Sequence, residues 1–169
     1  TPIRLALIRV PAGEFLMGSD AELDSDAKAR EQPQHRVDLP EFYIGKYLIT
    51  NAQYETFVRA TGHRAPKDWK HDQASADKGD HPVVYVSWRD VRAFCGWLSR
   101  ETRQVVRLPS EAEWEKAARG SDGRIYPWGD QAPTADLCNF RVNVGDTTPV
   151  GRYSPPGDSA YGCADMAGN

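Results

Sequence analysis

Three cysteines and four histidines are the residues of this chain best suited to bind a transition metal or to attack a substrate. The cysteines are Cys95, Cys138 and Cys163, and no two of them form a Cys-X-X-Cys pair. The histidines are His35, His63, His71 and His81, without an i, i+4 pair or a His-Glu-X-X-His motif. This spacing predicts neither a zinc site nor a disulfide framework, and we expect histidines that are solvated or cap local structure.

An acidic segment before residue 35 has the spacing of a calcium-binding loop. Its alternating carboxylates are Asp20, Glu22, Asp24 and Asp26, and Glu31 stands twelfth when counted from Asp20. The sixth position is Ser25, where the sharp turn of an EF-hand loop takes glycine, and no pair of flanking helices is evident. We therefore favour a solvated acidic loop over residues 18–34 and keep calcium binding as the alternative.

The composition argues against several broad classes of function. The chain has a formal net charge of -3 and no basic stripe, so we expect neither a nucleic acid nor an anionic membrane surface as its partner. No apolar run approaches the ~18 residues of a transmembrane helix. No glycine-rich phosphate-binding motif occurs, which gives nucleotide binding no support. An odd number of cysteines without a disulfide framework favours a reduced, cytoplasmic setting.

One domain spanning residues 1–169 is the simplest organisation, because this length is enough for one substantial core. The 14 glycines and 12 prolines lie between short periodic segments, which is typical of a loop-rich α+β domain. The chain opens on Thr1 and closes on an apolar turn at Gly168-Asn169. We therefore expect the natural protein to continue, with this domain truncated at its C-terminal end.

Three helices are predicted from N-terminal capping boxes. In each box, a Ser or Thr stands three residues before a Gln, Asp or Glu, so the two side chains can satisfy each other's free backbone N–H groups. The pairs are Thr50 with Gln53, Ser87 with Asp90, and Ser110 with Glu113. Gly62 and Gly120 supply left-handed ends for the first and third helices. Cys95 lies in the apolar stripe of the second helix, which predicts a buried thiol that acts as a small hydrophobe.

Alternating and β-branched stretches predict short antiparallel strands. We expect residues 3–10 and 14–17 to form a hairpin, followed by strands at 35–39 and 42–47, a strand or extended segment at 83–86 and a strand at 105–108. Of the five tryptophans, we expect at least three to lie in the core. Trp114, beside Ala117 and Ala118 on one helix face, is expected to pack closely on another element.

The order of several motifs resembles the formylglycine-generating enzyme, or sulfatase-modifying-factor, domain. The motifs are residues 10–18, 47–54, 81–83, 86–88, 107–120, 126–130, 147–151 and 161–169, which together run over nearly the whole chain. The resemblance implies a variant of the C-type lectin fold, with about three helices and short antiparallel strands. In that family, the final Gly-Asn opens a Gly-Asn-Val-Trp-Glu-Trp segment that lies beyond this chain.

The resemblance also implies which cofactors to expect. Formylglycine-generating enzymes oxidise a sulfatase cysteine with copper held by two cysteines in their C-terminal half. None of the three cysteines here matches that pair, so we expect no copper in this segment and no cysteine oxidation by this polypeptide alone. A soft Cu(I) ion needs such a thiolate pair.

Calcium is the better match, since the family holds structural calcium with Asn and nearby oxygens. By resemblance, a first site would use Asn139 and the backbone of Phe140, joined by Asn143 or Asp146. A second site would use Asp165 and the backbone of Gly168. Oxygen ligands of this kind suit calcium. The alternative is that these Asn and Asp side chains only form local turns.

Two functions remain open from the sequence. The first, which we favour, is a non-catalytic ligand- or protein-binding module, such as the variable proteins of bacterial diversity-generating retroelements, with a protein or peptide as partner. The second is a formylglycine-generating oxidase whose copper-binding half is a second chain or a missing C-terminal segment. In either case, we expect the isolated chain to associate, because its core near Trp114 and Trp128 would be incomplete.

Overall fold

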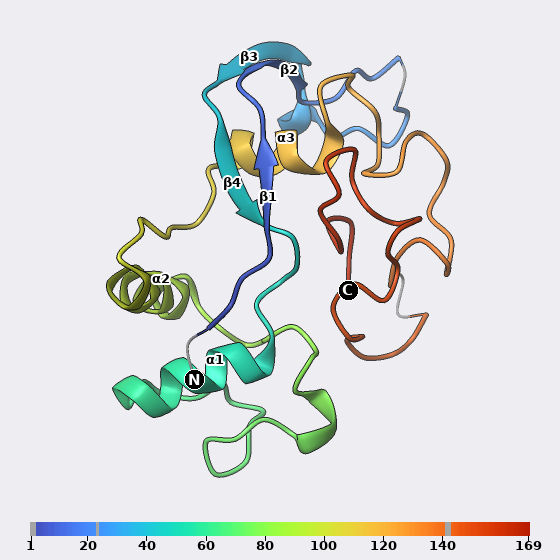
Figure 1. The fold of residues 1–169 in the computed structure, drawn as a ribbon. Helices are drawn as coiled ribbons and strands as arrows, with labels where there is room; N and C mark the ends of the chain where they lie inside the picture. The colour runs from blue at the N-terminus through green and yellow to red at the C-terminus, as the bar shows by residue number, and fades with distance from the viewer. Residues whose placement is uncertain (1–2, 23, 141–142) are drawn as a thin grey trace.

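A computed structural model describes residues 3–22, 24–140 and 143–169 of the chain (Figure 1). The strands are β1 (Leu7–Val10), β2 (Gly13–Met17), β3 (His35–Leu39) and β4 (Phe42–Gly45). The α-helices are α1 (Asn51–Thr61), α2 (Trp88–Thr102) and α3 (Glu111–Arg119), and the short 3-10 helices are η1 (Ala29–Glu31) and η2 (Ala76–Lys78). The part of the chain after α3 is built of turns and irregular segments. The loop-rich α+β architecture is therefore confirmed.

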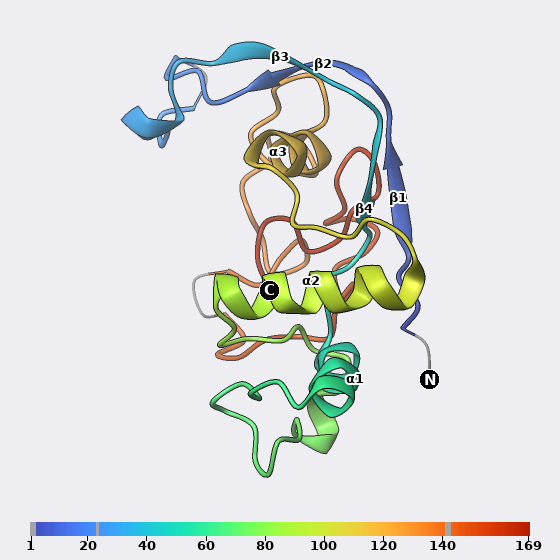
Figure 2. The same cartoon turned by 90° about the vertical axis from the view of Figure 1, so that its left-hand side faces the viewer.

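The four strands form one bent two-stranded ribbon. β1 pairs antiparallel with β4, and β2 pairs antiparallel with β3. Figure 2 shows this ribbon arching over α3. The predicted hairpin between residues 3–10 and 14–17 is wrong, because β1 and β2 follow each other along the same side of the ribbon, and the acidic loop makes the reversal. The backbone bends between them at Gly13, whose φ of +124° favours glycine.

A buried lysine holds this bend. Lys116 on α3 is 2 % exposed, and its ammonium donates hydrogen bonds to the carbonyl oxygens of Pro11 and Gly13, at 2.9 and 2.7 Å. The carbonyl oxygens between β1 and β2 therefore accept hydrogen bonds from α3. These bonds favour a bend over a tight hairpin turn at the Pro-Ala-Gly sequence.

All three predicted capping boxes are confirmed. Both reciprocal hydrogen bonds of the box are present at Thr50, Ser87 and Ser110. α1 ends at Gly62 in the left-handed helical conformation, as expected. α3 ends at Gly120 with φ 73° and ψ -150°, which also has positive φ but lies outside the left-handed helical region. No glycine marks the end of α2, where Arg103 takes the left-handed conformation with φ 56°.

The stretch 105–108, predicted as a strand, is an extended segment without a partner strand in the described residues. Ser99 on α2 takes the place of that partner, since its hydroxyl exchanges hydrogen bonds with the backbone N–H and C=O of Val106. The stretch 83–86, predicted as a strand or extended segment, is irregular and bends at Tyr85, whose φ is +57°. Pro82, just before it, forms an isolated bridge with Thr50.

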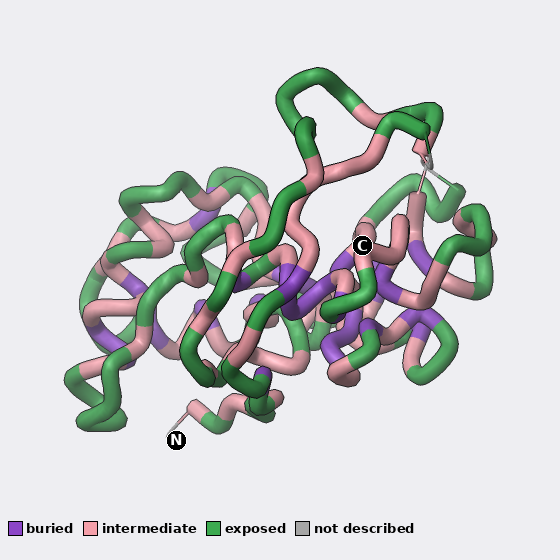
Figure 3. The backbone as a smooth tube through the Cα atoms, turned by 90° about the horizontal axis from the view of Figure 1, so that it is seen from above, coloured by how far each residue is buried: buried purple, intermediate pink, exposed green. Residues whose placement is uncertain are grey.

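Two hydrophobic clusters form much of the core of the described chain. The first lies between α1 and α2, and its buried members are Tyr54, Phe57, Val58, Phe94, Trp97 and Leu98. The second joins the ribbon, α3 and the C-terminal segment, and its buried members are Val10, Ala117, Ala118, Cys163 and Met166. Figure 3 shows the buried stretches inside the molecule and exposed loops around them.

Most of the tryptophans lie outside these clusters, so the expectation of at least three in the core is wrong. Trp97 is buried, whereas Trp69 and Trp128 are half-buried. Trp88 and Trp114 are 63 % and 46 % exposed. The small residues of α3 face the ribbon in place of Trp114, since Ala117 and Ala118 admit a close approach.

Among the described residues, no helix is both long enough and apolar enough to span a bilayer.

Candidate metal centre

The C-terminal turns bring the two predicted calcium sites next to each other. Gly168, from the second predicted site, lies against the backbone of Asn139, from the first. A Cβ atom added to Gly168 would meet the Asn139 carbonyl oxygen at 2.7 Å, and the φ of Gly168 is +135°. Only glycine permits this approach. The two sets of residues therefore form one neighbourhood and not two separate loops.

In the first set, most polar groups already bond within the loop. The Asn139 side-chain amide donates to the Asp146 carbonyl oxygen at 2.7 Å. The Phe140 N–H donates to the Asn143 side-chain oxygen at 3.0 Å, and the Asn143 N–H donates back to the Phe140 carbonyl at 3.0 Å. These are the local turns that Asn residues commonly make.

The carboxylate of Asp146 already pairs with the ammonium of Lys78. Its Oδ2 accepts from the Lys78 ammonium at 2.5 Å, and its Oδ1 accepts from the Thr147 N–H at 2.7 Å. The Lys78 ammonium is the main reason that the pKa of Asp146 is lowered. Because this carboxylate already faces a positive charge, Asp146 fits calcium ligation poorly.

In the second set, several buried polar atoms have no partner. Asp165 Oδ2 accepts from the Gly151 N–H at 2.7 Å, but Asp165 Oδ1 has no hydrogen bond with any described residue. The Thr148 hydroxyl and Asn169 Nδ2 are also buried and unpaired within the described chain. Asn169 Oδ1 accepts from the Thr148 N–H at 2.7 Å, which ties these residues together.

Burial raises the pKa of Asp165, and the Gly151 N–H and the Asn169 amide oppose this shift. The Asn169 amide thus lies near the carboxylate, although Asn169 Nδ2 and Asp165 Oδ1 do not meet at hydrogen-bonding geometry. Asp165 also has a φ of +58°. A buried carboxylate oxygen and a buried hydroxyl without partners are groups that a hard cation would satisfy, so Asp165 fits the predicted calcium.

Thr148 and Asn169 were missed as site residues by sequence reasoning. Both lie in motifs that carry the family resemblance, at 147–151 and 161–169, so a signal was present without a role attached to it. No cluster of three or more His, Cys, Asp or Glu side chains with metal-binding geometry occurs in the described part of the chain. A calcium ion here would therefore depend on Asp165 together with amide, hydroxyl and backbone oxygens.

The acidic loop does not gather its carboxylates. Asp20 Oδ1 accepts from the Glu22 N–H, and Asp24 Oδ1 accepts from the Asp26 N–H. Glu31 bonds back to the Lys28 N–H at the start of η1. The carboxylates of Asp20, Asp24 and Glu31 thus accept hydrogen bonds from nearby backbone N–H groups, as expected for a solvated loop.

The thiols do not form a copper site. Cys95 is half-buried, Cys138 and Cys163 are buried, and all three are free. Cys95 packs against the α1–α2 cluster, whereas Cys163 belongs to the cluster under the ribbon. Burial raises the pKa of each thiol, which disfavours the thiolate that Cu(I) needs. The three cysteines therefore do not fit copper.

The sequence predicted histidines that are solvated or cap local structure, and His35 fits this, since its Nδ1 lies 3.0 Å from the Pro33 carbonyl oxygen at an exposed site. Two other histidines instead contact residues far along the chain. His63 Nε2 lies 2.8 Å from Asp90 Oδ1 at the start of α2. His81 Nδ1 lies 2.8 Å from the Thr147 hydroxyl.

Residues 4–169 match the family described as sulfatase-modifying factor enzyme 1-like domain. The chain belongs to this family. The resemblance drawn from the order of the motifs is therefore confirmed.

Several members of the family have assigned activities. The chain is 32% identical to a hercynine oxygenase of Mycolicibacterium smegmatis over 96% of this chain and 43% of that protein. It is 32% identical to the formylglycine-generating enzyme of Streptomyces coelicolor over 96% of this chain and 66% of the enzyme. It is 28% identical to the inactive C-alpha-formylglycine-generating enzyme 2 of Bos taurus, over 96% of this chain and 68% of that protein. The chain thus spans roughly 40–70% of these relatives' lengths.

Solved structures confirm the fold. PvdO from Pseudomonas aeruginosa superposes with a TM-score of 0.79 and 29% identity, covering 96% of this chain and 67% of PvdO. The Treponema denticola variable protein 1 superposes with a TM-score of 0.72 and 20% identity, covering 99% of this chain and 71% of that protein. At 20% identity, the likeness to the Treponema denticola protein shows the fold alone.

Proposed function

We propose that this chain is a non-catalytic ligand- or protein-binding module on the scaffold of the formylglycine-generating enzymes. The observation that carries the proposal is the state of the thiols. All three cysteines are free, their pKa values are raised by burial, and two of them belong to different hydrophobic clusters. The scaffold is present, but the soft ligands for copper are not paired in it.

One relative supports a role without catalysis. The Bos taurus protein, whose name calls it inactive, aligns with 96% of this chain. A family scaffold can thus persist without the activity. The likeness to the Treponema variable protein adds that the same fold also occurs in a protein whose name does not describe an enzyme.

The second candidate is an oxidase that acts on a sulfatase cysteine. It is favoured by the 32% identity to the Streptomyces enzyme, of which this chain spans 66%. In this reading the copper-binding cysteines belong to polypeptide outside residues 1–169, either as a second chain or as a further segment. The C-terminal turns would then support a site completed elsewhere.

A peptide assay separates the two candidates. The full-length protein that contains this chain is incubated with Cu(I), oxygen and a cysteine peptide from a sulfatase, and the peptide is analysed by mass spectrometry, with the Streptomyces enzyme as positive control. The binding module predicts no formylglycine, whereas the oxidase would convert the peptide. Conversion of the peptide would overturn the proposal.

We also propose that calcium has a structural role in the C-terminal turns. The second predicted site carries this proposal, because Asp165 offers a buried carboxylate oxygen without a partner in the described chain. The oxygens of Asn139 and Gly168 lie in the same neighbourhood. Asn143 and Asp146 are committed to their own loop and to Lys78, so they would take no direct part.

A further inference from the structure

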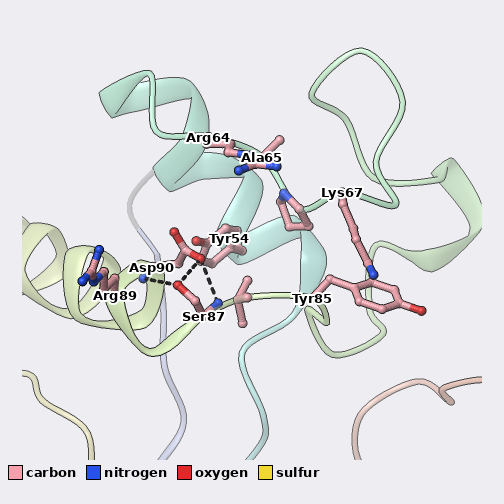
Figure 4. A pocket seen from close by; sticks show the side chains of 10 residues that line it. Tyr54, Arg64, Ala65, Lys67, Tyr85, Ser87, Arg89 and Asp90 are labelled. Carbon is pink, nitrogen blue, oxygen red and sulfur yellow. Dashed lines mark hydrogen bonds between the residues drawn. The ribbon is translucent and has the colours of Figure 1, made fainter.

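A pocket of about 510 Å³ opens at the start of α2, away from the C-terminal turns. Its walls come from the loop after α1 and from the residues that lead into α2, and Tyr54 of the first hydrophobic cluster also lines it. Figure 4 shows the pocket and the labelled side chains around it. Pockets that bind small groups in proteins usually have volumes of about 300–1,000 Å³.

The rim of the pocket is positive. Arg64, Lys67 and Arg89 line it, and none of the three forms an ion pair with any residue that the structure describes. The chain as a whole has a net charge of -3, so this is a local concentration of positive charge. Unpaired cations gathered around a pocket favour a ligand with negative charges.

The one acid at the pocket is already engaged. Asp90 Oδ2 accepts from the Ser87 N–H and hydroxyl at 2.8 and 2.6 Å, and Asp90 Oδ1 lies 2.8 Å from His63 Nε2. The Ser87 hydroxyl is the main reason that the pKa of Asp90 falls to about 2. Because both carboxylate oxygens have partners inside the protein, Asp90 is not available to the three cations.

Two exposed aromatic rings lie near the start of α2, and one of them, Tyr85, lines the pocket. Tyr85 is 61 % exposed, with the Lys67 ammonium 4.2 Å from its ring centroid. Trp88 is 63 % exposed, with the Arg92 guanidinium 4.9 Å from its ring centroid. Tyr85 also has a φ of +57°, which is unfavourable for an aromatic residue. Exposed Tyr, Trp and Arg together are typical of the residues that dominate protein binding surfaces.

We propose that this face binds an acidic peptide segment of a partner protein. Carboxylates of the segment would pair with Arg64, Lys67 and Arg89, and an apolar side chain would enter the pocket beside Tyr85. A nucleic acid is disfavoured, because it needs a longer basic stripe than three residues around one pocket. The inference rests on the proposed function as a binding module and names its class of partner.

The test uses a fluorescein-labelled, acetylated Glu-Glu-Leu-Glu-Glu peptide and fluorescence anisotropy at low ionic strength. The double variant R64E/R89E is expected to weaken binding at least tenfold, and Y85A at least threefold. The single variant R89E is expected to weaken binding at least threefold. Its matched control is R100E, which makes the same charge change as R89E at an exposed position near the other end of α2 and should change affinity less than twofold. Circular dichroism checks that each variant is folded.

Three outcomes would overturn the inference. The first is a peptide affinity that R100E lowers as much as R89E does, because binding would then follow net charge alone. The second is an oligo-dT strand that binds more tightly than the peptide through the same arginines. The third is self-association, seen by sedimentation, that R64E/R89E abolishes, since a second copy would then occupy the face. Formylglycine production in the peptide assay would instead refute the binding module and leave this titration as a separate result.

Discussion

Glu113 uses one carboxylate for two purposes. It caps α3 by accepting from the Ser110 N–H at 2.7 Å, and it forms a two-pronged pair with the Arg107 guanidinium at 2.7 and 2.6 Å. Its side chain is only 9% exposed. The Arg107 guanidinium is the main reason that the pKa of Glu113 falls to about 2.

The first prediction concerns acid and this carboxylate. Because the folded-state pKa lies below the value in an unfolded chain, the pair stabilises the fold fully above pH ~4.5 and loses this effect as pH falls toward 2. We expect Glu113→Gln to lower the free energy of unfolding at pH 7 by about 2 kcal/mol, from the lost charge-assisted bonds to Arg107, because glutamine can still accept from the Ser110 N–H. The difference from wild type should shrink in urea titrations at pH 3. Glu111→Gln, at an exposed site two residues earlier in α3, should change stability by less than ~0.5 kcal/mol.

The second prediction concerns Asp165 and calcium. Burial raises its pKa, so the calcium-free fold binds the proton more tightly than the unfolded chain and loses stability as pH rises through the folded-state pKa. Excess calcium should raise the melting temperature by about 5–10 °C relative to EDTA. Asp165→Asn should remove both effects in calorimetry.

Asp146→Asn is the matched control for this measurement. Its carboxylate already pairs with Lys78, so the calcium response should persist. A response that survives Asp165→Asn and disappears in Asp146→Asn would place calcium in the other loop and contradict us.

At the scale of elements, the end of α2 is a local weakness. At the end of α2, Arg103 adopts the left-handed conformation that Gly62 adopts at the end of α1. We predict that Arg103→Gly stabilises the protein by about 0.5–1 kcal/mol, because glycine takes this conformation without a steric cost. Gly62→Ala should destabilise by about 1 kcal/mol for the same reason. Guanidinium denaturation of both variants tests the pair, and loss of stability in Arg103→Gly would refute the argument.

The Lys116 ammonium is one of the groups that attach α3 to the ribbon, beside Glu115 and Arg119, which bond to the backbone of Gly18. Replacing Lys116 by Met keeps the length of the side chain but leaves the Pro11 and Gly13 carbonyl oxygens without their donor. We predict a loss of about 1–3 kcal/mol in unfolding free energy. Lys46→Met is a control outside this bend, with an expected effect below ~0.5 kcal/mol. Equal effects of the two variants in urea denaturation would show that the buried bonds are not important.

The helices could be predicted from the sequence because their signals are local. A capping box places two side chains three residues apart, and Thr50, Ser87 and Ser110 each form the bonds that their spacing predicts. Strand pairing could not be predicted in the same way. The bend after β1 is held by Lys116, about a hundred residues away, and a Pro-Ala-Gly sequence looks like a turn without it.

The candidate site was also predictable only where its signals are local. Asp165 and Gly168 could be named from motifs, but only the fold brings Gly168 against Asn139. The Lys78–Asp146 pair joins residues 68 positions apart, and no local pattern marks it. Exposure of Trp114 was also unpredictable, because its helical spacing matches that of buried Ala117 and Ala118.

At the scale of the molecule, large apolar side chains remain exposed on several surfaces. Leu108 and Trp114 are 40 % and 46 % exposed and line one shallow pocket with Pro109. We predict that the chain associates as its concentration rises, and that L108Q/W114Q reduces this association in sedimentation velocity. Val105 is 91 % exposed but is not among the residues lining this pocket, so V105Q should change little. A strictly monomeric wild type at high concentration would contradict the prediction.

The hydrogen bonds from Lys116 to Pro11 and Gly13 also affect folding during synthesis on the ribosome. They join residues 105 and 103 positions apart, so the ribosome must add about a hundred residues before the first strands meet their helix. At ~5–20 residues per second, that interval is on the order of 5–20 seconds. Throughout this time the nascent ribbon would display unsupported apolar side chains such as Val10. Vectorial synthesis therefore makes the amino-terminal third a natural client for holding chaperones.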